Sequence, residues 1–228
     1  MTRTGKTVGL GVWSGLALAV AGTVFADGAV LTTAYRGSSP VSDEQLSFPW
    51  GGATAVATSV VWGSAQILFT IGLIVFSRSP AITNTRGRRG ALVAVAGSIL
   101  YTVAHAVSVV AHDAKMDDAP AMVALTLFGL GTILVAAGML VAGIDVARSR
   151  VWSGWRRFSP AVLGAWMLVM VPLQFTVALV GAVAVYAAAT AALGVALIVE
   201  TVTACEGVAP ASGSWRSPAA HRADGRSR

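Results

Sequence analysis

Charged residues are scarce in this sequence, and their scarcity excludes most soluble folds. Only 11% of the 228 residues are Asp, Glu, Lys or Arg, whereas a soluble domain carries about a quarter. The longest gap between charges separates Arg157 from Glu200, so that residues 158–199 form 42 uncharged positions. Since one membrane-spanning helix needs about 20 apolar residues, this stretch predicts two helices joined by a tight turn near Gly181.

Cysteine, lysine and histidine are also nearly absent. Cys205 is the only cysteine, which excludes an intramolecular disulfide. Arginine supplies 14 of the 16 basic residues, a bias that favours a bacterial source. The only histidines are His105, His112 and His221, and the first two lie on one helix face about 10 Å apart, too far to share a metal or a haem. We therefore predict no cofactor and no bound metal.

Common enzyme motifs are missing as well. The sequence contains no Walker loop, no His-Glu-x-x-His zinc motif, no paired-Glu motif of membrane prenyl-endopeptidases and no Gly-x-Ser-Gly motif of rhomboid proteases. Their absence disfavours an enzyme without excluding one. The pI near 10.4 comes from arginines in short loops beside apolar runs, so we expect no nucleic-acid partner.

Six apolar runs fill residues 1–204 and predict an all-α fold, a bundle of six transmembrane helices. The predicted spans are about 8–26, 53–76, 91–111, 119–144, 160–178 and 182–203, and residues 205–228 are predicted to form a disordered basic cytoplasmic tail. Small residues recur at helical spacing in two of the runs, and such stripes let helix backbones approach closely. The stripes are Gly11, Gly15 and Ala19 in the first run and Gly131 and Gly138 in the fourth.

The first run has two interpretations. Arg3 and Lys6, an apolar segment and Val24-Phe25-Ala26 before Asp27 resemble a cleavable signal peptide. The run from Val8 to Ala26 is longer than a usual signal core, and its small-residue stripe is typical of a packed helix. We favour the retained helix and leave cleavage open.

The distribution of basic residues predicts the orientation. When six spans alternate across the membrane, only Arg36 and Lys115 fall on the side opposite the other 14 basic residues. Basic loops stay in the cytoplasm, so we predict a multi-pass protein of the bacterial plasma membrane with both termini inside. Besides the lipid bilayer, anionic lipid headgroups are a candidate partner of the inner arginines, and a homo- or hetero-oligomer is left open.

Residues 27–52 are predicted to form the longest outer loop. Its aromatic pair, Phe48 and Trp50, is expected at the lipid headgroups, where amphipathic rings settle. The alternative is a lid over an outer cavity. On the inner side, Trp152 and Trp155 are expected at the membrane interface, and Glu200 is expected to reach water or an arginine.

Polar side chains inside the predicted spans mark a candidate site. Ser59, Gly63, Gln66 and Thr70 form one narrow face of the second span. The candidate intramembrane site consists of Gln66, Tyr101, His105 and Gln174. His105 is the most informative of these, because an ionisable group within a membrane is a functional candidate. We favour the other interpretation, a neutral imidazole that donates to a neighbouring helix and stabilises the bundle, and leave the functional one open.

Two further features are weaker candidates. Pro172 is expected to kink the fifth helix two residues before Gln174, a feature of some transport sites and of ordinary packing. The side chains of His112, Asp113, Asp117 and Asp118 have metal-binding chemistry, but we favour the simpler interpretation of a solvated acidic loop.

One segment resembles a known group of proteins. Gly154-Trp155-Arg156-Arg157-Phe158-Ser159-Pro160 looks like a pattern in small uncharacterised six-span integral membrane proteins of actinobacteria. The resemblance covers about 20 residues and implies an architecture but no activity. Our functional hypothesis is a non-enzymatic, transporter-like membrane protein. The alternatives are a structural or regulatory subunit that packs against a partner, and an intramembrane redox or hydrolytic enzyme that uses His105.

Overall fold

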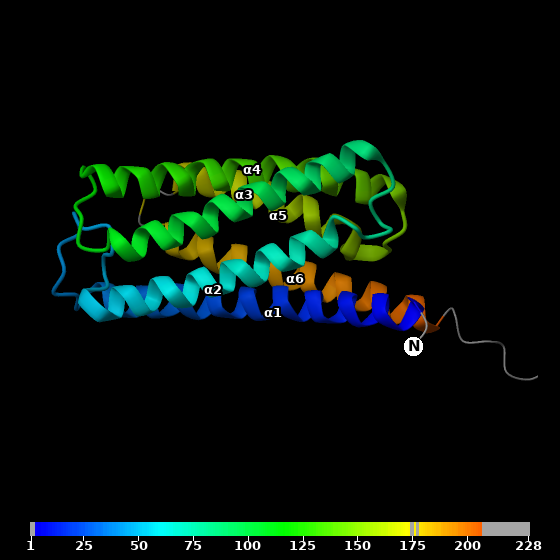
Figure 1. The fold of residues 1–228 in the computed structure, drawn as a ribbon, viewed down its shortest axis with the longest axis horizontal. Helices are drawn as coiled ribbons and strands as arrows, with labels where there is room; N and C mark the ends of the chain where they lie inside the picture. The colour runs from blue at the N-terminus through cyan, green and yellow to red at the C-terminus, as the bar shows by residue number, and fades with distance from the viewer. Residues whose placement is uncertain (1–2, 174–175, 177, 207–228) are drawn as a thin grey trace, which may run out of the picture.

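The computed structural model describes residues 3–173, 176 and 178–206, which form six α-helices and one short 3-10 helix (Figure 1). The elements are α1 (Arg3–Arg36), α2 (Gly52–Phe76), α3 (Thr85–Val110), α4 (Ala119–Ser149), η1 (Gly154–Phe158), α5 (Ser159–Leu173) and α6 (Leu179–Glu206). The helices run up and down along the long axis, each packs against the next, and α1 packs against α6 to close the ring. Apart from one isolated bridge between Gln45 and Lys115, the described residues contain no β-structure, so the predicted all-α class is confirmed for them.

Five of the helices are long and apolar enough to cross a membrane. These are α2, α3 and α4 over their full lengths, and Gly11–Arg36 of α1 and Leu179–Thr203 of α6. The remaining helix, α5, has 15 residues, which extend about 22 Å against about 30 Å of hydrocarbon. The architecture is therefore that of a membrane-embedded helical bundle with five candidate spans.

Helix α5 is shorter than the predicted fifth span. The fifth span was predicted to reach residue 178 with a kink at Pro172, but α5 ends at Leu173, directly after that proline. Pro172 lies inside the last turn of α5, where its ring removes a backbone donor. Helix resumes at Leu179, two residues before Gly181.

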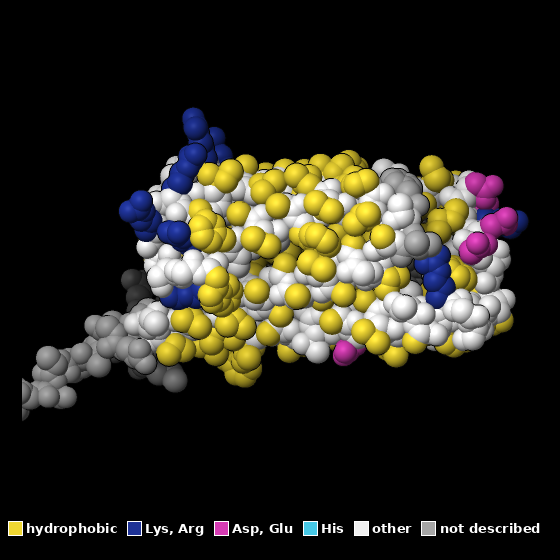
Figure 2. Space-filling view, turned by 180° about the vertical axis from the view of Figure 1, so that it is seen from behind, with side chains coloured by type: hydrophobic (Ala, Val, Ile, Leu, Met, Phe, Trp, Pro, Cys, Tyr) yellow, Lys and Arg dark blue, Asp and Glu magenta, His cyan; other side chains and the backbone are white. Residues whose placement is uncertain are grey.

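Opposite charges gather at opposite ends of the bundle. Figure 2 shows most Lys and Arg side chains at one end, most Asp and Glu side chains at the other, and hydrophobic side chains over the surface between them. We call the end with loops 77–84 and 150–158 the basic end, and the end with loops 37–51 and 111–118 the acidic end. Large exposed apolar side chains such as Val60, Ile99 and Ile133 lie between the two ends, as expected for a surface in contact with lipid.

Glycines bring two pairs of helices into close contact. A methyl group added at Gly15 would overlap Ile198 and the Gly194 carbonyl of α6, and one added at Gly138 would overlap the α3 backbone at Gly90 and Ala94. The predicted small-residue stripes of the first and fourth runs therefore pack α1 on α6 and α4 on α3. Such close approach is typical of membrane bundles, in which dispersion forces between backbones replace the hydrophobic effect.

The first helix is longer than predicted, because residues 27–36 continue it instead of opening the outer loop. Asp27 does not interrupt the helix, since its side chain points outward and is exposed. On the opposite side Gly28 lies directly against the indole of Trp62, and the Thr33 hydroxyl donates to the Ala29 carbonyl at 2.8 Å. The predicted outer loop is therefore shortened to residues 37–51.

The fourth helix also runs beyond its predicted end at residue 144 and carries Asp145, which had been expected in a loop. The carboxylate of Asp145 is buried, with 4% of its surface exposed. It accepts hydrogen bonds from the Thr83 amide at 2.9 Å and the Asn84 amide at 3.2 Å, and from both of their side chains. Because these donors satisfy the charge, the residue continues the helix and ties the α2–α3 loop to α4.

Candidate functional site

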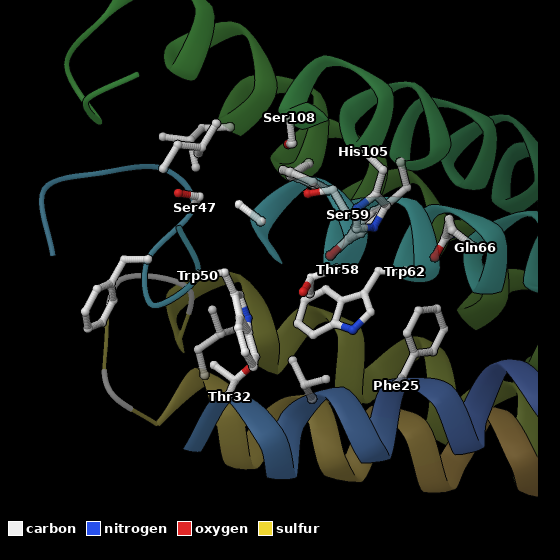
Figure 3. Close-up of a pocket in the computed structure, with 18 of the residues that line it drawn as sticks. Phe25, Thr32, Ser47, Trp50, Thr58, Ser59, Trp62, Gln66, His105 and Ser108 are labelled. Atoms are coloured by element: carbon white, nitrogen blue, oxygen red, sulfur yellow. The ribbon is translucent and has the colours of Figure 1, made fainter. Parts of the chain in front are cut away.

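A cavity of about 350 Å³ lies on the axis of the bundle toward the acidic end (Figure 3). All six α-helices and both acidic-end loops contribute to its wall. Toward the basic end the axis is filled by a packed core that includes Phe69, Leu73, Met139 and Leu193, each with no exposed surface. The cavity is thus closed on one side by side-chain packing and bordered on the other by loops.

The α2 wall of the cavity is a helical stripe made of Ser59, Trp62 and Gln66. Figure 3 shows Trp62 reaching from α2 toward α1, with His105 on the α3 side. The predicted polar face of the second span therefore turns inward, as expected. A methyl group added at Gly63, the glycine of this face, would lie 3.3 Å from the His105 Cβ atom, so the glycine leaves room for the histidine side chain.

A hydrogen-bond network forms the floor of the cavity at Gln66. The side-chain amide of Gln66 donates to Ser98 Oγ at 2.9 Å, and the Thr70 hydroxyl donates to the backbone carbonyl of Gln66 at 2.8 Å. The Ser98 and Thr70 hydroxyls are 2.6 Å apart, and since Thr70 has used its only proton, Ser98 donates here. The network cross-links α2 to α3 and holds the Gln66 side chain against the cavity floor.

His105 is enclosed by aromatic rings. Its ring centroid lies 5.0 Å from that of Phe128, 5.8 Å from that of Tyr101 and 6.4 Å from that of Trp62. The side chain is 7% exposed, and it lines the cavity. Among the described residues no carboxylate or hydroxyl forms a hydrogen bond with its imidazole, so the predicted alternative of a helix cross-link is not observed there.

Three of the four predicted site residues meet at this cavity. Gln66, Tyr101 and His105 all line it, whereas Gln174 lies outside the described residues. Sequence reasoning missed the aromatic part of the wall, which includes Phe25, Trp62, Phe128 and Tyr186. The only signal for these side chains was their helical spacing, which is the same for a ring in a packed core and for a ring that faces a cavity.

The loop of residues 37–51 covers the acidic end of the cavity. Phe48 and Trp50 line the cavity, so the structure favours the predicted lid over the headgroup position. The end of α1 holds both rings, because Tyr35 stacks on Trp50 at 5.0 Å between centroids and the Arg36 guanidinium lies 5.5 Å above the Phe48 ring. The Ser39 hydroxyl also donates to the Pro49 carbonyl at 2.7 Å.

The second acidic-end loop, residues 111–118, is joined to this lid. The Leu46 amide donates to the Ala114 carbonyl at 3.0 Å, and the Met116 amide donates to the Glu44 carbonyl at 2.8 Å. The ammonium group of Lys115 lies 3.6 Å from the Glu44 carboxylate. The two loops therefore form one cover, and a movement of the lid requires these few contacts to open.

The basic end is closed by a tryptophan that had been expected at the membrane interface. Trp152 is only 2% exposed, packs against Phe76 at 6.1 Å between ring centroids, and donates from its indole nitrogen to Glu200 at 2.9 Å. The Ser79 hydroxyl also donates to Glu200, at 2.9 Å. Glu200 therefore accepts from a serine and a tryptophan, and no arginine among the described residues pairs with it. Trp155 is 55% exposed, as an interface residue should be.

The acidic loop offers little for a metal. His112 pairs with Asp113 at 3.1 Å, and Asp118 accepts a hydrogen bond from the Lys115 amide at 2.8 Å. Within residues 3–173, 176 and 178–206, no group of three or more His, Cys, Asp or Glu side chains is arranged to hold a metal ion. What the arrangement provides is an enclosed, aromatic surface suited to binding.

Comparisons with known proteins assign no family to this geometry. No family model, no curated protein and no solved structure matches the chain. The resemblance of the Gly154–Pro160 segment to small actinobacterial membrane proteins stays a prediction. The functional argument therefore rests on the cavity and on the two closed ends of the bundle.

Proposed function

We propose that this chain is a non-enzymatic, transporter-like membrane protein that takes a small molecule into the cavity at the acidic end. The observation that carries the proposal is a 350 Å³ space bordered by all six α-helices, with the intramembrane His105 in its wall. Binding pockets for small molecules have volumes of about 300–1,000 Å³ and combine apolar walls with a few polar groups. The lid at one end and the packed core at the other fit a site that is open to one side of the membrane at a time.

In the proposed topology the chain crosses the membrane six times with both termini in the cytoplasm. Glu200, near the end of α6, binds Ser79 and Trp152 at the basic end, while Leu179, at its start, lines the cavity at the acidic end. The segment between α4 and α6 must then return from the basic to the acidic end, which supports α5 and its connection as the sixth crossing. Exposed Arg78, Arg88 and Arg150 at the basic end support its cytoplasmic position and its contact with anionic lipid headgroups.

A single cysteine in the cavity tests this proposal. The Ser59→Cys variant in a Cys205→Ser background has one thiol, which lies in the cavity wall (Figure 3). We expect a membrane-impermeant thiol reagent to label it rapidly from the outer side of spheroplasts, and more slowly from the inner side of inverted vesicles. Slow inner labelling follows because an alternating site must open toward the cytoplasm in a minor state.

The matched control is Ser64→Cys on the same helix. Ser64 is exposed on the outer surface of α2 between the two ends of the bundle, where lipid would shield it from a charged reagent, so we expect no labelling from either side. If Ser59→Cys reacts from the outer side alone, the transport hypothesis is wrong and the cavity is a binding site only. If it reacts from neither side, the cavity is not accessible and the proposal fails.

One observation favours a second candidate function, a membrane subunit that packs against a partner. Asp27 is exposed on the surface of α1, nine residues or about 13 Å before Arg36, within a candidate span. Among the described residues it forms no ion pair, yet charged groups inside membranes almost always have a partner. A neighbouring transmembrane helix with a hydrogen-bond donor at that depth would supply one.

The Asp27→Leu variant tests the subunit hypothesis. In a mild-detergent extract of native membranes, we expect the wild-type chain of 23.2 kDa to migrate as a larger assembly. The fraction of the variant that migrates in this assembly should be several-fold smaller. Asp43→Leu, at an exposed acid of the loop, should leave the migration unchanged. Equal migration of wild type and Asp27→Leu would contradict the subunit role.

A further inference from the structure

Aromatic rings make up a third of the side chains that line the cavity. Seven of the lining side chains are Phe, Tyr or Trp, and they come from α1, the lid, α2, α3, α4 and α6. The lining rings are tilted against one another: Tyr101 and Phe128 meet at 68°, and Phe25 and Tyr186 at 38°. Rings that are tilted toward one another in this way present π-faces from several directions, as in the aromatic cages that hold methylated ammonium groups.

The same wall contains no formal charge. Among the described residues that line the cavity there is no Asp, Glu, Lys or Arg. An anion would therefore enter without a compensating basic group, at a high desolvation cost. A compact, strongly hydrated cation would likewise need a carboxylate, but a cation whose charge is spread over methyl groups loses little hydration and gains from the ring faces.

The surroundings of the cavity mouth attract cations. The acidic-end loops carry five exposed acids, Asp43, Glu44, Asp113, Asp117 and Asp118. The basic residues nearby are Lys115 in the second loop and Arg36 at the end of α1. Lys115 is paired with Glu44, which leaves the outer surface with an excess of negative charge. Such a surface raises the local concentration of cations and disfavours anions.

The lid itself contains a contact between a cation and an aromatic ring. The Arg36 guanidinium lies 5.5 Å from the centroid of Phe48, and the Phe48 ring is part of the cavity wall. An aromatic side chain of the site thus already holds a delocalised cation. A volume of 350 Å³ is near the lower end for small-molecule pockets, which limits the ligand to about one ring and one substituted ammonium group.

We propose that the cavity at the acidic end binds a small, weakly hydrated organic cation, such as an aromatic quaternary ammonium compound. This inference rests on the proposed function, because it assigns a ligand class to the same cavity. The contacts that would select the cation are the faces of Trp50, Trp62 and Tyr186, with the Ser59 and Thr58 hydroxyls at the α2 wall.

The test compares two probes of equal shape and different charge, phenyltrimethylammonium and tert-butylbenzene. Each is titrated into the purified full chain in detergent at matched free aqueous concentration, and binding is read from the shift in thermal unfolding. We expect phenyltrimethylammonium to bind about tenfold more tightly, as cation–π contacts in a desolvated site would give. The Trp50→Leu and Trp62→Leu variants should lose this preference and still bind tert-butylbenzene.

The exposed Trp155 provides the control, since Trp155→Leu should keep the full preference. Trp50 lies in the lid loop and not in a helix, so its variant remains informative if Trp62→Leu folds poorly. Equal or tighter binding of tert-butylbenzene to the wild-type chain would overturn the cation assignment while leaving the cavity as a binding site. Binding of neither probe would also overturn it, and the labelling of Ser59→Cys would then decide separately whether the cavity is accessible.

Discussion

Replacement of Trp152 by alanine is expected to lower the free energy of unfolding by about 3–5 kcal/mol. Trp152 is 2% exposed, although it belongs to the loop between α4 and α5 and not to a helix. It fills the space beside Phe76 at the basic end, and its indole nitrogen donates to Glu200 at 2.9 Å. The variant would leave a cavity of aromatic size and would remove one of the donors that Glu200 needs, and both losses act in the same direction.

The measurement is equilibrium unfolding in mixed micelles with increasing SDS. Trp155→Ala is the matched control, because Trp155 lies three residues further along the chain and is 55% exposed. We expect its free energy of unfolding to stay within about 0.5 kcal/mol of the wild-type value, as for most surface substitutions. Equal losses for the two variants would show that Trp152 does not pack at the basic end as described.

The sequence was sufficient for the main architecture, because membrane helices leave a strong signal. A helix in hydrocarbon must satisfy its own backbone and avoid charge, so long uncharged runs identify the helices directly. The glycine stripes at Gly15 and Gly138 also identified the faces that pack on α6 and α3. The helix boundaries were less predictable from the sequence, because a single charged residue predicts the end of a span, whereas Asp27 and Asp145 both lie within helices.

These two aspartates show why sequence alone could not place the boundaries. Asp27 stays in α1 with its side chain exposed, whereas Asp145 stays in α4 because donors of the α2–α3 loop surround it. The sequence does not reveal which loop folds back on which helix, and that contact decides whether a carboxylate can be buried. The partners of Trp152 and Glu200 were unpredictable for the same reason, since they lie 76 and 121 residues earlier in the chain, at Phe76 and Ser79.

The candidate site was predictable in its polar part only. Gln66, Tyr101 and His105 stood out because polar groups are rare inside spans. The rings of Phe25 and Tyr186 did not, because an aromatic residue within an apolar run has the same neighbours in sequence whether it faces a core or a cavity. Only the three-dimensional arrangement showed that these rings share a wall with His105.

Replacement of Asp145 by alanine is expected to lower the free energy of unfolding by about 3 kcal/mol. The Asp145 carboxylate accepts from the amides of Thr83 and Asn84 and from both of their side chains, and it lies against Gly87 of α3. Its removal would leave two backbone N–H groups without their acceptor in a region that Asp145 itself buries. Each unsatisfied buried donor costs about 1–3 kcal/mol, and partial hydration of the loop reduces the sum.

The Asp145→Ala variant is compared with Asp117→Ala by the same SDS titration. Asp117 is an exposed acid of the acidic-end loop, and we expect its removal to change the free energy of unfolding by less than about 0.5 kcal/mol. Asn84→Ala serves as a second probe of the contact, because it removes one side-chain donor and the Asn84 cap, whose oxygen accepts from the Gly87 amide at 2.7 Å. If the loop contact is responsible, the double variant should lose less than the sum of the two single losses, since both act on one interaction. Strict additivity would instead show that Asp145 stabilises α4 without its partners in the α2–α3 loop.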